Sequence, residues 1–162
     1  MWQGSSKQDI LNALNTAIVG ERYTLAAFQK YKEQATNAEF RTLLQEAIAT
    51  KHRHIELLEN RLRNFGEAIT WQTMGGEPLA SLQSWLQSSD NESLIRRTLG
   101  DLQTGAVDAH GLDLRLTDPQ TTELFKQISN NLLYHVERVG ELYRAIKGNA
   151  VKPPLPSTIA MG

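Results

Sequence analysis

The chain has 162 residues, a length that favours one domain with a single core. Its formal net charge of −1 and pI of about 6.4 argue against a nucleic-acid-binding protein, which needs a basic surface. The sequence contains no cysteine, which excludes disulfides, thiol catalysis and thiolate-bound metal centres. No stretch approaches the roughly 18 consecutive apolar residues of a membrane span. The N-terminus lacks the apolar segment of a secretory signal, so we expect a cytoplasmic protein without membrane contacts.

The first half of the chain carries two long helical patterns. The first covers residues 7–35, with Ser6 as N-cap and Asp9 three residues further on. The second covers residues 38–64 and ends before Gly66, a suitable residue to follow a helix. Both carry apolar residues at steps of three and four, the spacing of helices that pack into a bundle.

Residues 67–90 are predicted to be a long connection that contains a short amphipathic helix over residues 79–86. A third long helix covers residues 91–116. The order of elements therefore includes a crossover between the two halves of the chain.

The fourth long helix begins with Asp118 as N-cap and Pro119 at its first position, and is predicted to end at Gly148. Residues 149–162 contain three prolines and are predicted to be an extended or disordered tail. Residues 1–148 then form an all-α, up-down four-helix bundle, in which two helical hairpins are joined by one long crossover. No strand pattern, phosphate loop or nucleophile elbow competes with this interpretation.

The two predicted hairpins form a weak internal repeat. A shift of 81 residues places His54 on His135, Glu21 on Leu102 and Lys51 on Leu132. The shift also superimposes the turns within the two hairpins. Two such hairpins are expected to pack about a pseudo-twofold axis, which brings these positions together.

Four polar residues lie on the apolar stripes: Glu21, Lys51, His54 and His135. Burial of a charge costs several kcal/mol unless it is paired, roughly 3–5 kcal/mol when one partner is missing, so these residues need a joint explanation. Two other acidic residues beside this region, Asp101 and Asp108, are expected on exposed helix faces.

The chain resembles the ferritin-like superfamily, in particular its rubrerythrin-type members. That family binds two irons with a Glu from each of two helices and Glu-x-x-His from each of the other two. The stretches "LNTAIVGERY", "KHRH", "LGDLQT" and "LLYH" resemble the four ligand segments. The resemblance covers residues 8–147 and implies a ferritin-like bundle. Because members of the family often dimerise, it also implies a homodimer.

Three of the six ligand positions keep the family's residue type: Glu21, His54 and His135. The other three do not, because they hold Lys51, Leu102 and Leu132. Carboxylates both bind and neutralise the irons, so their loss predicts a degenerate site without the di-iron centre.

Two interpretations of the remaining polar cluster stay open. In the first, Glu21 and Lys51 form an interior ion pair, His54 and His135 are hydrogen-bonded core residues, and there is no cofactor. In the second, Glu21, His54 and His135 hold one iron or other divalent metal with open positions.

The first interpretation predicts a ferritin-like scaffold or binding protein of unknown specific role. The second predicts a redox or peroxide-handling enzyme with an altered mononuclear site. A third hypothesis is an assembly module that contacts a protein partner through the C-terminal tail.

Overall fold

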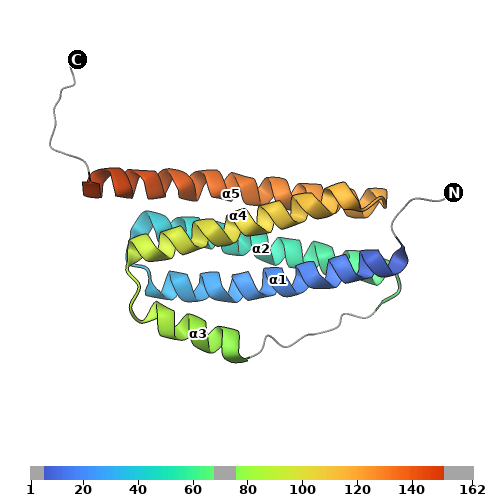
Figure 1. The fold of residues 1–162 in the computed structure, drawn as a ribbon, viewed down its shortest axis with the longest axis horizontal. Helices are drawn as coiled ribbons and strands as arrows, with labels where there is room; N and C mark the ends of the chain where they lie inside the picture. Colours follow the sequence, from blue (N-terminus) through green and yellow to red (C-terminus); the bar gives the residue numbers. More distant parts are fainter. Residues whose placement is uncertain (1–5, 68–75, 152–162) are drawn as a thin grey trace, which may run out of the picture.

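The computed structural model describes residues 6–67 and 76–151, and within them all regular secondary structure is helical. The helices are α1 (Lys7–Gln34), α2 (Ala38–Asn64), α3 (Gly76–Leu86), α4 (Asn91–Arg115) and α5 (Pro119–Val151) (Figure 1). The predicted tail from residue 152 onward and the crossover segment 68–75 lie outside the described residues. The all-α prediction is confirmed.

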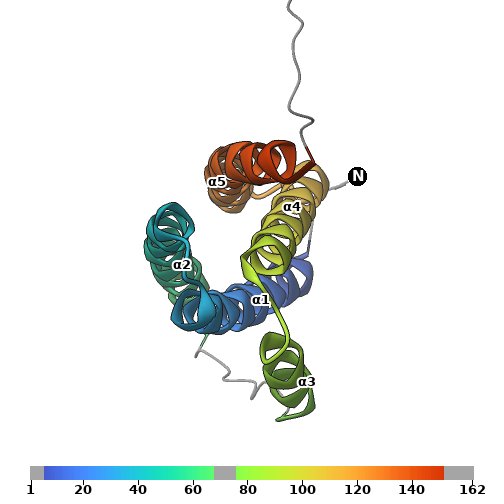
Figure 2. The same ribbon diagram turned by 90° about the vertical axis from the view of Figure 1, so that its left-hand side faces the viewer.

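Four long helices surround a common interior. Around this interior α1 contacts α2, α2 contacts α5, α5 contacts α4, and α4 contacts α1 (Figure 2). The short α3 lies outside this ring, against α1. Because the crossover returns the chain to the end where α2 began, α2 and α4 run in the same direction (Figure 1). This is a four-helix bundle of two antiparallel hairpins with one long crossover, as predicted.

The helix boundaries follow local signals in the sequence. Ser6 and Asp9 form a reciprocal capping box at the start of α1, with N···O distances of 3.0 and 3.2 Å. At the end of α2, Gly66 has a φ of 79°, a left-handed conformation that glycine adopts without strain.

The predicted end of α5 at Gly148 is wrong, because the helix continues to Val151. A glycine weakens a helix by about 1 kcal/mol without ending it. The first residue that cannot continue the helix is Pro153, which also disfavours the helical conformation of the residue before it.

Each hairpin turn is bound to the other hairpin. Asn91 at the start of α4 bonds the Thr36 amide (3.0 Å) and hydroxyl (2.8 Å) in the α1–α2 turn. At the opposite end of the bundle, Arg61 of α2 donates to Asp118 in the α4–α5 turn at 2.7 Å. These contacts lock the two hairpins in register.

The core consists of the apolar stripes of the four long helices. Leu14, Phe28, Leu58, Leu102 and Leu132 are completely buried. The same interior holds polar side chains that are almost as deeply buried. In the described ranges, no helix is long and apolar enough to cross a membrane.

Candidate functional site

A buried ion pair lies in the bundle interior between α1 and α2. Lys51 Nζ lies 2.6 Å from Glu21 Oε2, and the two side chains are only 1% and 9% exposed. The Lys51 ammonium also lies 5.6 Å from the centre of the Phe28 ring. A lysine at this depth requires a counter-charge, and Glu21 provides it.

His54, one turn after Lys51 on α2, shares the same carboxylate. Its Nδ1 lies 2.8 Å from Glu21 Oε1, and its Nε2 lies 3.1 Å from Asn131 Nδ2 of α5. Since the Asn131 amide donates through Nδ2, Nε2 accepts and Nδ1 carries the proton that it donates to Glu21. In this arrangement both ring nitrogens have a hydrogen-bond partner.

The surroundings of Glu21 favour its ionised form. Burial alone would raise the pKa of Glu21, but the hydrogen bond from His54 and the charge of Lys51 outweigh burial and hold the pKa below its usual 4.5. Glu21 therefore stays a carboxylate with both oxygens occupied, one by each basic partner.

His135 of α5 binds a different partner. Its Nε2 lies 2.8 Å from Thr50 Oγ1 of α2, and its side chain is buried. The two histidine contacts are related by the internal repeat, because the shift of 81 residues that maps His54 onto His135 also maps Thr50 onto Asn131. Each histidine thus bonds a polar residue four positions before the other histidine. This reciprocal pattern follows the pseudo-twofold relation between the hairpins.

The structure therefore brings Glu21, Lys51 and His54 into direct contact, with His135 bonded separately to Thr50. Among the residues that the structure describes, no three His, Asp or Glu side chains are grouped closely enough to hold one metal ion. The mononuclear ligand set of Glu21, His54 and His135 stays a prediction.

Leucines stand at the other two positions that the family resemblance assigns to carboxylates. Leu102 of α4 and Leu132 of α5 are both completely buried. A Cβ atom at Gly105 would lie 3.0 Å from Leu132 Cδ1 and 4.0 Å from Lys51 Nζ. Leu132 therefore packs closely against α4 at Gly105, where an added methyl group would require the leucine side chain to shift by a few tenths of an ångström.

The expectation that Asp101 is exposed is wrong. Asp101 is half-buried and accepts a hydrogen bond from the Tyr31 hydroxyl at 3.0 Å, while Asp108 is exposed as expected. Burial raises the pKa of Asp101 above its usual 3.8, although Tyr31, Arg97 and Lys51 partly oppose the shift. The sequence held one signal for this contact: Tyr31 follows the buried Phe28 by one turn, so its hydroxyl needs a partner.

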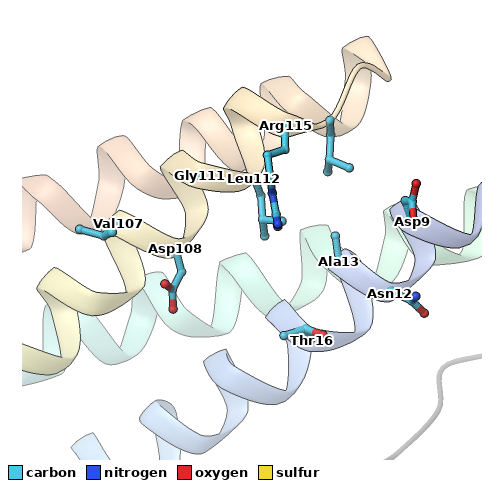
Figure 3. Close-up of a pocket in the computed structure, with 10 residues that line it drawn as sticks. Asp9, Asn12, Ala13, Thr16, Val107, Asp108, Gly111, Leu112 and Arg115 are labelled. Atoms are coloured by element: carbon cyan, nitrogen blue, oxygen red, sulfur yellow. The ribbon is translucent and has the colours of Figure 1, made fainter. Parts of the chain in front are cut away.

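A cleft between α1 and α4 leads to the ion pair. It has a volume of about 300 Å³, and both Glu21 and Lys51 line it. It shares Thr16, Asp108 and Leu112 with a wider depression nearer the start of α1. Figure 3 shows that depression, with Asp108 and Arg115 extending from α4 toward α1. The buried pair is thus adjacent to space that a small molecule could enter.

The environment of His135 predicts a loss of stability in mild acid. Burial lowers the pKa of His135 below its usual 6.5, and His54, Arg138 and Lys51 reinforce the shift against Glu46. His135 binds a proton more readily in the unfolded chain than in the folded protein. The stability that neutral His135 contributes is therefore complete above about pH 6.5 and declines as the pH falls toward the folded-state pKa.

We expect the free energy of unfolding, measured by urea denaturation, to fall between pH 7.5 and 5.5 in the wild type. The fall should be smaller in His135→Asn. His52→Asn changes an exposed histidine on α2 and serves as the matched control. An equal pH dependence in wild type and His135→Asn would contradict the assignment.

Comparison with known proteins identifies relatives by structure. No protein-family model matches the chain, and no curated protein matches it significantly. A two-domain protein from Anabaena variabilis, with DJ-1/ThiJ/PfpI-like and ferritin-like domains, matches 97% of this chain at 40% identity and a TM-score of 0.77. The present chain spans only 42% of the length of that protein.

Two more distant structures share the fold. The bacterioferritin-related protein of Bacteroides fragilis, a dodecameric thioferritin, has 12% identity and a TM-score of 0.73, with 90% of this chain and 92% of that chain covered. CopM in its Cu(I)-bound form has 13% identity and a TM-score of 0.70, with 91% and 100% covered. These two structures show a shared fold, and the match at 40% identity to a protein with a ferritin-like domain shows that the chain belongs to the ferritin-like superfamily.

Proposed function

We propose that this chain is a metal-free ferritin-like protein with a binding role, in which the Lys51 ammonium replaces the metal charge of the family. The observation that carries this proposal is the 2.6 Å contact between Lys51 and Glu21 in the bundle interior. The Lys51 side chain already neutralises the Glu21 carboxylate, which the family resemblance assigns as a metal ligand.

The donor set supports the loss of the di-iron centre. Two irons need several carboxylates as ligands and as counter-charges. Here Leu102 and Leu132 offer no donor atoms, and Lys51 adds a positive charge that would repel a metal ion. The two oxygens of Glu21 already bond Lys51 and His54.

Metal analysis tests the proposal directly. Protein purified without chelator, and the same protein reloaded with Fe(II) under anaerobic conditions, should contain no stoichiometric metal. The variants His54→Ala and His135→Ala should then match His52→Ala, an exposed control on the same helix as His54. One equivalent of metal that is lost in His54→Ala and His135→Ala, but kept in His52→Ala, would overturn the proposal. That outcome would support the mononuclear redox enzyme instead.

We further propose a homodimer in the cytoplasm. Large apolar side chains are exposed on two adjacent helices, Val107 and Leu114 on α4 and Leu133 and Tyr134 on α5. If two copies of the chain buried these side chains against each other, the apolar area removed from water would stabilise the dimer. Light scattering on the metal-analysis sample distinguishes the dimer from a monomer.

A protein partner for the tail from residue 152 onward stays a prediction, because those residues lie outside the described ranges.

A further inference from the structure

The α1–α4 cleft has the form of a small-molecule site. Its volume of about 300 Å³ lies between two helices and extends inward to the Lys51–Glu21 pair. Its inner wall is apolar and consists of Leu58, Ala109, Leu112, Phe125 and Ile128. Clefts between the helices of a bundle, apolar with a few converging polar groups, are common ligand sites.

The α1 wall of this cleft contains a glycine, Gly20, that no neighbouring side chain forces to be small. At Gly20 on α1, an added Cβ atom would meet no atom within 4 Å, and Gly20 lines the cleft. Glycine inside a helix is less stable than alanine, so the bundle would gain stability from a side chain here. Gly105 on the opposite wall differs, because its Cβ would lie 3.0 Å from Leu132. A larger side chain at position 20 would therefore fit without a clash and would extend over the cleft.

The charges around the cleft favour a cation. Four charged residues line it, and three of them are acidic: Glu21, Asp101 and Asp108, against Lys51. Lys51 is in direct contact with Glu21, and the Arg97 guanidinium lies 3.7 Å from Asp101, so each of these two carboxylates already has a cation beside it. Asp108 therefore provides the remaining negative charge of the cleft. The excess of one charge sign in a cleft attracts ligands of the other sign.

We propose that the α1–α4 cleft binds a small aliphatic amine, with its ammonium group toward Asp108 and its hydrocarbon chain against Phe125 and Ile128. The proposal rests on the binding role proposed above and names the ligand class for it. The apolar wall selects an aliphatic body, and the Asp108 carboxylate selects the positive head group.

Titration calorimetry of the full chain with hexylamine and with hexanoate tests this assignment. The two probes have the same chain length and opposite charge at pH 7. We expect saturable 1:1 binding of hexylamine, weakened by salt, and no binding of hexanoate. Asp108→Asn should weaken hexylamine binding roughly fivefold. Asp113→Asn makes the same charge change on α4 outside the cleft and should leave the binding unchanged.

A second pair of variants tests the location. Gly20→Leu should fill the cleft and abolish hexylamine binding, whereas Gly148→Leu, on α5 and with open space around its Cβ position, should not. Equal binding of both probes, absence of hexylamine binding, or binding unaffected by Gly20→Leu would each overturn the inference. The amine-binding experiments do not depend on the metal content of the protein. Failure of this inference is therefore distinguishable from failure of the proposed metal-free function.

Discussion

Replacement of Lys51 with alanine is expected to lower the free energy of unfolding by about 3–5 kcal/mol, because it leaves the Glu21 carboxylate buried without its cation. Lys51 is 1% exposed and Glu21 is 9% exposed, so the carboxylate left behind would be largely shielded from water. Urea denaturation at pH 7.5 measures the loss. Lys30→Ala removes an exposed lysine from α1 and should change stability by less than about 0.5 kcal/mol.

A double variant separates the charge from the packing. In Lys51→Met combined with Glu21→Gln, both charges are gone, the side-chain volumes are similar, and the introduced amide oxygen could still accept from His54. We expect this variant to recover most of the stability, to within about 1–2 kcal/mol of the wild type, because neutral replacements of a buried pair are tolerated. If Lys51→Ala costs no more than Lys30→Ala, the ion pair does not stabilise the fold.

The second large effect is expected from restoring the family's carboxylates. The triple variant Lys51→Glu, Leu102→Glu and Leu132→Glu places three carboxylates at positions that are 0–1% exposed. Without metal, repulsion and desolvation should destabilise the bundle by more than about 5 kcal/mol, which exceeds the stability of many domains. Anaerobic Fe(II) should restore the fold, because ligand binding to the native state alone stabilises it. Circular dichroism with and without Fe(II) measures both effects.

Matched variants show whether rescue depends on the proposed ligands. The corresponding triple glutamine variant buries similar polar groups without negative charge, so Fe(II) should not rescue it. Addition of His54→Ala to the triple glutamate variant should weaken rescue. A triple glutamate variant that folds without iron and binds none would contradict the alignment of these positions with the family's ligands.

The sequence predicts the helices of this protein closely. Ser6 and Asp9, Asp118 and Pro119, and Gly66 mark helix ends through local backbone chemistry, so they are readable without tertiary structure. The end of α5 lies beyond its predicted place because a glycine such as Gly148 weakens a helix but does not stop it. Long amphipathic stripes also identify which faces point inward.

The partners within the interior are harder to predict. Spacing places Glu21, Lys51 and His54 on inward faces, but it does not determine which side chains meet across the bundle. The contact of Asn131 with His54, and of Asp101 with Tyr31, depends on the rotation of each helix about its axis. The internal repeat held a signal for the histidine contacts alone, because the same shift that relates the two histidines also relates Thr50 to Asn131.

The contact between Lys51 and Glu21 has a consequence for how the protein matures. A metal ion is in equilibrium with its surroundings and leaves its site when its concentration falls, whereas a side chain is always present at a fixed local concentration. Under the metal-free function that we propose, assembly of this bundle needs no metallochaperone and no loading step, and iron starvation or a chelator does not weaken it. The Glu21 carboxylate itself would lose its charge only in stronger acid, at a pH below its usual pKa of 4.5.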